Sequence, residues 1–279
     1  MDLHFPSLSF SVSDARYTLV TGEWNNSVLH SDLYARLYLV DAGQGRIVLD
    51  NEERELAPGF LYLIPPGTVY RHIPSSGLGH FWVHFTAELF GSLSLFDVYA
   101  SLFAMDPEQA NPGGLQAARR MMAELVRAKE ALDEQEGNDP AAALQLRSAL
   151  GYLLSFFIKA RQEKDTRLSD LGRFAAVVAA IQSRLDRPIA IGELADIAGM
   201  HPTYFANRFH SVFGSPPRRY IMVKRVERAQ RLLWTSEEPL KGIAASCGFD
   251  DLPYFSRVFR KVAGVAPGTY REMGKRIRT

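Results

Sequence analysis

The side chains nearest to a catalytic or metal-binding pattern are histidines in the first third of the chain. His80 and His84 lie four residues apart in a run that reads as a strand, which places them on one face. A metal-dependent enzyme would need a His-x-His pair, a following Glu and a further His around one ion. No carboxylate joins the two histidines before Glu88. We therefore expect no metal site, no cofactor and no catalytic residue, and a metal-dependent enzyme is the alternative.

The composition excludes several other classes of protein. The chain has 279 residues, of which 47% are hydrophobic and 23% are charged, and these are the proportions of a globular protein with two domains. No apolar stretch is long enough for a membrane helix, and the N-terminus lacks the pattern of a signal peptide. The single cysteine, Cys247, cannot form an internal disulfide, so we expect it to pack in a core. These features predict a cytoplasmic protein with no membrane partner.

Charge is distributed unevenly along the chain, although the total is only +1. Residues 170–279 carry 18 Lys and Arg against 10 Asp and Glu, a net charge of +8. Residues 1–169 carry 14 Lys and Arg against 21 Asp and Glu, a net charge of −7. A basic domain beside an acidic one favours a polyanion as the ligand of the basic part.

An internal repeat lies in the basic part of the chain. The segment 204–221 matches 254–271 at an offset of 50 residues, with Tyr, Phe, Val, Gly and Pro recurring in register. Each copy, with the residues before it, reads helix, tight turn, helix, a unit whose second helix can enter a DNA major groove. The segment 218–234 joins the copies as a helix, long enough for two recognition helices to enter successive major grooves about 34 Å apart.

Turn and cap residues mark the boundaries of these helices. Gly199 and Gly248 stand where a helix must end in the left-handed conformation, which glycine adopts without a Cβ penalty. Pro202 suits the first position of one second helix, and Asp250 or Asp251 the cap of the other. We expect the aromatic residues spaced four apart to form cores: Phe205, Phe209, Phe255 and Phe259.

The region 189–271 resembles the paired helix-turn-helix domain of the AraC/XylS family of bacterial transcription regulators. The most specific part is GFDDLPYFSRVFRKVAGVAPGTYR, residues 248–271. The first copy departs from the family pattern, because Asn207 stands where the family usually has an arginine. Three positions that are typically serine in the family hold other residues: Pro216, Pro253 and Ala266. The resemblance implies sequence-specific binding to double-stranded DNA.

The resemblance also places individual residues on the two recognition helices. The exposed face of the first helix is expected to carry Thr203, Ala206 and Asn207, and that of the second Leu252, Pro253, Ser256 and Arg257. We assign base readout to Asn207 and Arg257, because asparagine pairs bidentately with adenine and arginine with guanine. Phosphate contacts, which position without reading sequence, are assigned to Arg208, His210, Arg260 and Lys261. For Arg208, a solvated side chain or an intradomain ion pair is the alternative.

Other elements of the chain must position these helices and couple them to a regulatory signal. Residues 15–86 contain short β-branched and aromatic runs separated by turn residues, which is typical of a sandwich or barrel. Two amphipathic helix patterns follow on either side of the polar turn 133–140. Their apolar stripes suit a dimer face or packing against the β domain. This order resembles family members that couple a cupin-like barrel to a dimerising helix pair.

We therefore predict an α+β multidomain chain. Its parts are a cupin-like effector-binding barrel over residues 1–110, a helical hairpin over 111–162, a linker over 163–172, and an all-α domain over 173–279 with two helix-turn-helix units joined by a connecting helix. The partners predicted with this architecture are double-stranded DNA, a small-molecule effector and a second copy of the chain, with RNA polymerase if the protein is an activator. The sequence leaves activator or repressor undecided.

The resemblance extends to the sensor of sugar-binding members of the family. It places five residues on or near the effector pocket, two of them on a neighbouring strand: His72, His80 and Trp82, and Arg36 and Tyr38. Aromatic faces and hydrogen-bonding edges are what a sugar pocket requires, so a sugar is the candidate effector. Trp82 is equally suited to the core of the barrel. The alternatives are a metal-dependent cupin enzyme and a regulator whose barrel only dimerises.

Overall fold

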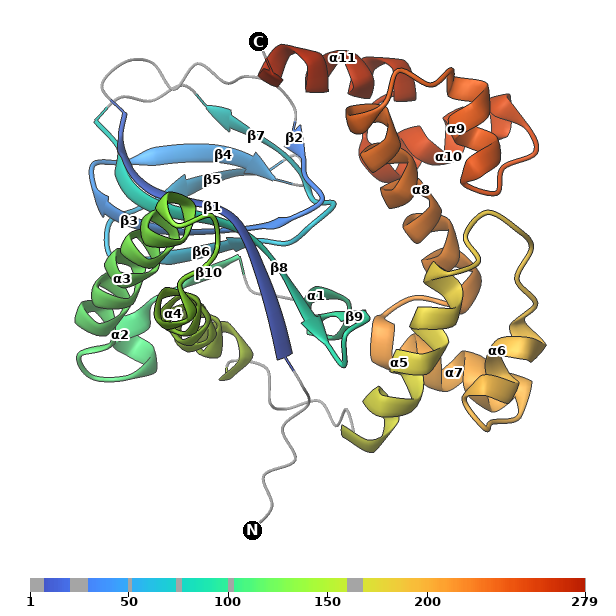
Figure 1. The fold of residues 1–279 in the computed structure, drawn as a ribbon, viewed down its shortest axis with the longest axis horizontal. Helices are drawn as coiled ribbons and strands as arrows, with labels where there is room; N and C mark the ends of the chain where they lie inside the picture. The colour runs from blue at the N-terminus through green and yellow to red at the C-terminus, as the bar shows by residue number, and fades with distance from the viewer. Residues whose placement is uncertain are drawn as a thin grey trace. The chain divides into compact units, whose positions relative to one another are not determined.

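The computed structural model describes residues 8–20, 30–49, 52–73, 77–99, 103–159 and 168–278 (Figure 1). The chain divides into two compact units. We call the described residues of 10–87 and 99–165 the sheet unit, and those of 1–9, 88–98 and 166–279 the helical unit. None of the described helices is both long enough and apolar enough to span a membrane.

Two sheets form the body of the sheet unit, although residues 8–9, 88–89 and 93–94 of the larger sheet belong to the helical unit. The larger contains β1 (Leu8–Leu19), β3 (Ala35–Ala42), β6 (Leu61–Ile64), β8 (Gly79–Leu89), β9 (Leu93–Ser94) and β10 (Ala104–Met105). The smaller contains β2 (His30–Ser31), β4 (Gly45–Leu49), β5 (Glu52–Leu56) and β7 (Val69–Ile73). The strands of the larger sheet are ordered β1-β8-β3-β6-β10, with β9 paired to β8, and those of the smaller are ordered β2-β7-β4-β5.

These sheets do not close into one barrel within the described residues. In a closed barrel every strand is paired on both edges. Here β1 and β10 end the larger sheet, and β2 and β5 end the smaller one. The predicted sheet-rich N-terminal domain is confirmed, and its strands form an open two-sheet arrangement.

Alternation along β3 directs side chains to two faces of the larger sheet. Tyr38 packs in one buried cluster with Ile47 of β4 and Tyr70 of β7, so this face meets the smaller sheet. Leu37 and Leu39 point the opposite way, because successive strand residues alternate, and both are fully buried. The core of the sheet unit therefore lies on both sides of β3.

A helix pair follows the sheets, as the sequence predicted. After the short helix α2 (Pro107–Ala110), α3 (Gly114–Glu134) and α4 (Pro140–Lys159) pack against each other, and α3 contacts β3. Their buried side chains include those of the predicted apolar stripes: Ala118, Met122, Leu125, Leu146, Leu150 and Leu153. The stripes are thus used within the chain, while Leu144 and Tyr152 of α4 stay exposed.

The helical unit contains two helix-turn-helix units. The first consists of α6 (Ile191–Ile197) and α7 (Pro202–Phe213), and the second of α9 (Leu240–Ser246) and α10 (Leu252–Ala263). The connecting helix α8 (Pro217–Thr235) lies between them, and the remaining helices are α1 (Leu95–Val98), α5 (Leu168–Gln182) and α11 (Pro267–Arg278). Helix α5 begins inside the segment 163–172 predicted as a linker, of which 163–167 lie outside the described residues.

The predicted turn and cap residues are confirmed. Gly199 and Gly248 adopt positive φ angles of 63° and 74°. Pro202 is the first residue of α7. The side chain of Asp251 accepts a hydrogen bond from the backbone N–H of Tyr254 at 2.8 Å and so caps α10. Local sequence signals therefore determine where both recognition helices begin.

Each helix-turn-helix unit has its own aromatic core. Phe205 and Phe209 are fully buried and contact Phe174 of α5. Phe255 and Phe259 are fully buried in a second cluster. Burying one such ring contributes about 1.5–3 kcal/mol, so these cores stabilise the unit. The outer faces of α7 and α10 are not needed to form these cores. Cys247 packs in the second core, as predicted.

Candidate nucleic-acid interface and candidate effector site

Helix α7 presents a polar outer face. Thr203, Asn207 and His210 are exposed, whereas Ala206 and Arg208 are half-buried. The N-cap residue His201 accepts the backbone N–H of Thr203 at 3.4 Å. All five predicted contact residues on this helix are therefore at least partly accessible to solvent.

Helix α10 presents the equivalent face of the second unit. Pro253, Arg257, Arg260 and Lys261 are exposed, and Leu252 and Ser256 are half-buried. Arg260 and Lys261 lie in the last turn of the helix, where cations also interact favourably with the helix dipole. This helix therefore carries more positive charge than α7 on its accessible surface.

Two exposed tyrosines on these faces were not predicted as contact residues. Tyr204 is 60% exposed and Tyr254 is 42% exposed, although both are large apolar side chains. They occupy equivalent positions of the repeat, directly before a core phenylalanine. The repeat gave a signal for them, because both tyrosines recur in register, but no role was assigned to either, and only the structure shows that the tyrosine is exposed and the following phenylalanine buried.

Arg225 of α8 braces the two helix-turn-helix units against each other. Its guanidinium donates to the carbonyl oxygen of Gly248 at 2.7 Å and to that of Arg187 at 2.7 Å. It also lies 5.9 Å from the ring centre of Phe249. Gly248 belongs to the turn of the second unit, and Arg187 precedes α6 of the first. The brace therefore links the chain before the first unit to the turn of the second unit through α8.

Residues 88–98, which we call the docking segment, begin with the last two residues of β8 and belong to the helical unit. The Ser92 hydroxyl donates to the carbonyl oxygen of Ala175 in α5 at 3.0 Å. The Gln182 side-chain amide donates to the carbonyl oxygen of Ser92 at 3.1 Å. Leu93 and Leu95 are buried beside these bonds. The end of β8 is thus anchored to α5 of the helical unit.

Asp97 anchors the docking segment to α8. Its carboxylate accepts the Tyr220 hydroxyl at 2.7 Å and the Lys224 ammonium at 3.0 Å. Lys224 also pairs with Glu227 at 3.0 Å, and its side chain is only 11% exposed. Burial alone would lower the pKa of Lys224, but Glu227 and Asp97 raise it above its ordinary value. The ammonium therefore stays charged in this largely buried place.

The predicted effector residues Arg36 and Tyr38 belong to a buried polar cluster between the sheets. Arg36 Nε donates to Asp32 at 2.8 Å, and its two terminal nitrogens donate to Tyr38 at 3.3 Å and Tyr34 at 3.1 Å. The Tyr70 hydroxyl donates to the same Asp32 oxygen at 2.8 Å. Burial raises the pKa of Tyr34 to about 12. The cluster offers several neutral hydroxyls around one neutralised ion pair.

The other predicted effector residues lie on the same face of the unit. His80 meets the Tyr38 ring edge-on at 5.6 Å, and His72 is buried beside Tyr70. Burial lowers the pKa of His80 to about 4, so its imidazole is neutral near pH 7. Trp82 is paired with Tyr38 across β8 and β3. The structure thus brings all five predicted residues to the space between the sheets.

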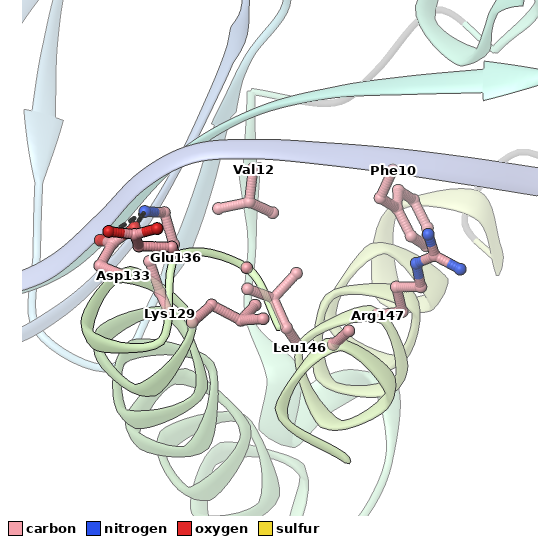
Figure 2. A pocket seen from close by; sticks show the side chains of 10 residues that line it. Phe10, Val12, Lys129, Asp133, Glu136, Leu146 and Arg147 are labelled. Carbon is pink, nitrogen blue, oxygen red and sulfur yellow. Dashed lines mark hydrogen bonds and ion pairs between the residues drawn. The ribbon is translucent and has the colours of Figure 1, made fainter. Parts of the chain in front are cut away.

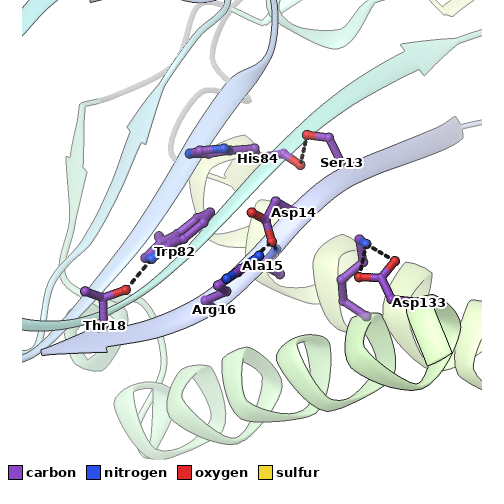
Figure 3. A network of polar contacts seen from close by, with 9 residues as sticks. Ser13, Asp14, Ala15, Arg16, Thr18, Trp82, His84 and Asp133 are labelled. Atoms are coloured by element: carbon purple, nitrogen blue, oxygen red, sulfur yellow. Dashed lines mark hydrogen bonds and ion pairs between the residues drawn. The ribbon is translucent and has the colours of Figure 1, made fainter. Parts of the chain in front are cut away.

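Trp82 and His84 extend this face toward β1 (Figure 3). The Trp82 indole N–H donates to Thr18 at 2.8 Å. The half-buried His84 ring lies 4.6 Å from Trp82 and 4.6 Å from Tyr34. His84 was not assigned to the pocket from the sequence, although its spacing from His80 places both on one face; the structure adds its contacts with Tyr34 and Trp82.

A separate open groove lies between β1 and the α3–α4 turn (Figure 2). Its volume is about 310 Å³. Apolar residues such as Phe10 and Leu146 form part of its wall, and Arg147 and the Lys129–Asp133 ion pair lie at its polar parts. None of the five predicted effector residues lines this groove.

The described residues contain no group of three or more His, Cys, Asp or Glu side chains that could hold a metal ion. His80 and His84 share a face of β8, but His80 contacts Tyr38, and His84 lies between Tyr34 and Trp82.

Two family models match the chain. The AraC-like ligand binding domain matches residues 19–154, and a helix-turn-helix domain matches residues 194–273. The first match begins at Leu19, the last residue of β1, and covers the other strands and the helix pair up to Leu154. The second begins in α6, includes both recognition helices and ends in α11.

Curated relatives and solved structures agree with these matches. The Arabinose operon regulatory protein of Salmonella typhimurium is 24% identical over 84% of this chain and 82% of its own length. The uncharacterized HTH-type transcriptional regulator YobQ of Bacillus subtilis is 36% identical over 34% of this chain. The chain spans 40% of that regulator, and 37% and 46% of two further relatives. ToxT from Vibrio cholerae O395 shares the fold, with a TM-score of 0.54 and 16% identity over 95% of this chain and 98% of its own.

Proposed function

Because the chain belongs to the AraC family of transcriptional regulators, we propose that it binds double-stranded DNA in a sequence-specific way under the control of a small molecule. The observation that carries this proposal is the pair of accessible polar faces on α7 and α10, held in one orientation by α8 and Arg225. Two helices fixed in this way are suited to successive major grooves on one side of a duplex.

Base readout is assigned to Asn207 and Arg257. Both side chains are exposed on the outer faces of their helices. Asparagine discriminates adenine and arginine discriminates guanine by paired hydrogen bonds in the major groove. The remaining residues of the two faces are proposed to make apolar or hydroxyl contacts with the DNA: Thr203, Ala206, Leu252, Pro253 and Ser256.

Phosphate contacts are assigned to Arg208, His210, Arg260 and Lys261. Three of these side chains are exposed, and Arg208 is half-buried. Binding to phosphates releases counterions, so the affinity for any duplex should fall steeply as the salt concentration rises. These residues set the strength of binding and leave the choice of sequence to Asn207 and Arg257.

The effector is proposed to bind between the two sheets, at Arg36, Tyr38, His72, His80 and Trp82. The Arg36 charge is already neutralised by Asp32, and tyrosine hydroxyls surround the pair. Such a site complements a neutral polyhydroxylated molecule better than an anion, because an added carboxylate would compete with Asp32. We therefore keep a sugar as the candidate effector.

Strand β8 is proposed to pass the effector signal onward. It carries His80 and Trp82 in the sheet unit, and its chain continues directly into the docking segment of the helical unit. An effector changes DNA binding only if it binds two conformations with different affinity. We propose a homodimer in which these conformations present the paired recognition helices differently, with RNA polymerase as a further partner if the protein activates transcription.

Selection of duplexes from a random-sequence library with the full-length chain tests the DNA-binding part of the proposal. We expect one motif with two separated elements to be enriched. The double variant Asn207→Ala and Arg257→Ala should lose this preference, while Arg46→Ala, an exposed arginine of β4, should keep it. If no sequence is enriched, or if the double variant selects the same motif with the same affinity, the proposed readout is refuted.

A thermal-shift screen tests the effector part. An effector at 100 times its dissociation constant stabilises the folded state by about 2.7 kcal/mol. The screen should include sugars, sugar acids and apolar carboxylic acids, each with and without a chelator, since ToxT has been solved bound to (E)-4-(8-methylnaphthalen-1-yl)but-3-enoic acid. A sugar hit that Arg36→Met abolishes supports the proposed site. A shift with carboxylic acids alone contradicts the polyhydroxylated effector.

A further inference from the structure

Tyr254 lies on the outer face of α10, but no DNA contact has been assigned to it. It is 42% exposed on the outer face of the helix, where an aromatic ring gains little from burial. Its backbone N–H is bonded to Asp251, but that bond does not depend on the ring. The aromatic side chain therefore needs another explanation.

The ring of Tyr254 lies between the core and Arg257. On its inner side it meets the buried ring of Phe249, with the ring centres 6.1 Å apart. On its outer side the guanidinium carbon of Arg257 lies 6.0 Å from the ring centre. Positions three apart on a helix share a face, so this contact is built into the sequence spacing of α10.

The first helix-turn-helix unit lacks both neighbours of this ring. The turn glycine Gly199 is followed by Met200, whereas Gly248 is followed by Phe249. Three residues after Tyr204 stands Asn207, where the second unit has Arg257. Tyr204 is correspondingly more exposed, at 60% against 42% for Tyr254. The repeat thus provides an internal comparison between a supported and an unsupported tyrosine.

We propose that Tyr254 is a positioning residue that holds the Arg257 guanidinium over its ring, ready for a guanine edge, and so sets the sequence preference of the second helix-turn-helix unit. This inference rests on the proposed DNA-binding function. A planar guanidinium stacks on an aromatic face, and holding a flexible arginine in one orientation lowers the ordering cost of a bidentate contact. Asn207 is shorter and needs no such support.

The test uses the full-length chain and the duplex selected from the random library. The Arg257→Ala variant first identifies the one base pair that it no longer distinguishes. The measured quantity is the discrimination ratio, which is the affinity for the selected duplex divided by the affinity for a duplex changed at this base pair. Tyr254→Leu should lower this ratio about 2- to 5-fold, the range expected for an exposed cation–π contact. Tyr254→Phe should preserve it, because the ring remains.

Two controls separate positioning from general stability. Tyr204→Leu should leave the ratio at this base pair unchanged. In the Arg257→Ala background, Tyr254→Leu should cause no further change in the ratio. An unchanged ratio in Tyr254→Leu, or an equal loss in Tyr254→Phe, overturns the proposal. If the wild-type chain selects no sequence, the DNA-binding function itself fails, which is a different result.

A measurement on the free protein gives an independent test that does not require a folded leucine variant. In the wild-type chain, the side-chain NMR resonances of Arg257, identified by their loss in Arg257→Lys, should show a ring-current shift. Tyr254→Phe should keep this shift. Resonances of Arg257 at the positions of a freely solvated arginine would overturn the proposal.

Discussion

Replacing Gly248 by alanine should disrupt the brace between the two helix-turn-helix units. Gly248 has a φ angle of 74°, which L-residues adopt with strain. A Cβ atom at this position would lie 2.4 Å from the carbonyl oxygen of Leu185 and 2.7 Å from the guanidinium of Arg225. The carbonyl belongs to the backbone, so moving Arg225 alone cannot relieve the overlap, and the second turn must shift away from Leu185 and Arg225.

The expected loss in the free energy of unfolding can be worked out from these contacts. The left-handed conformation costs alanine about 1–2 kcal/mol. A hydrogen bond from a charged donor contributes about 1.5–3 kcal/mol, and displacing Arg225 breaks one or both of its bonds to carbonyl oxygens. We therefore expect Gly248→Ala to destabilise the helical unit by about 2.5–5 kcal/mol if one bond is lost and by about 4–8 kcal/mol if both are lost, a large share of the stability of a typical domain.

Gly199 provides the matched control. It ends the first helix of the first unit with a φ angle of 63°, but a Cβ atom there would meet nothing within 4 Å. Gly199→Ala should lose only the conformational part, about 1–2 kcal/mol. Urea unfolding followed by circular dichroism at 222 nm measures both variants, and fluorescence anisotropy measures their affinity for the selected duplex. If Gly248→Ala is no less stable than Gly199→Ala, Arg225 does not brace the two units.

Three further predictions concern DNA contacts, docking and pH. Arg257→Ala should lose about 1–3 kcal/mol of discrimination at one base pair, whereas Lys261→Ala should weaken binding to all duplexes alike; equal discrimination in both variants contradicts the assigned roles. Asp97→Asn should lower the stability of the helical unit by about 1.5–3 kcal/mol in urea unfolding, because a buried ammonium loses a charged partner, and the exposed Asp196 of α6 provides a control that should change little. Burial lowers the pKa of His80 from 6.5 to about 4. Between pH 6.5 and about pH 4, His80 is therefore protonated in the unfolded chain but neutral in the folded chain. Stability should therefore fall as the pH drops through this window, by up to about 1.4 kcal/mol per pH unit, and His80→Gln should reduce the slope of the urea midpoint against pH; an unchanged slope refutes it.

The helical unit could be predicted in detail because its signals are local. The turn glycines, the first-position Pro202, the Asp251 cap and the phenylalanines spaced four apart each act over one or two helical turns. A short-range pattern of this kind is read directly from the order of residues. The structure confirmed these elements, and the exposed faces of α7 and α10 follow from the helical period.

Prediction was less complete for the sheet unit. The short strands and the helix pair were expected, but the sequence resemblance favoured a barrel, and the described strands leave four edges open. The part played by Asp32, Tyr34 and Tyr70 around Arg36 was not foreseen, since these residues come from different segments that only strand pairing brings together.

The sequence by itself determined the two helix-turn-helix units, their caps and cores, and the basic surface that they present. Tertiary structure alone decided that residues 88–98 pack in the helical unit, where Asp97 meets Lys224 across 127 positions of the chain. It also decided that Tyr254 is exposed beside Arg257 while the adjacent Phe255 is buried. The physical reason is that helix and turn formation depends on neighbours within a few residues, whereas docking and burial depend on which distant surfaces exclude water together.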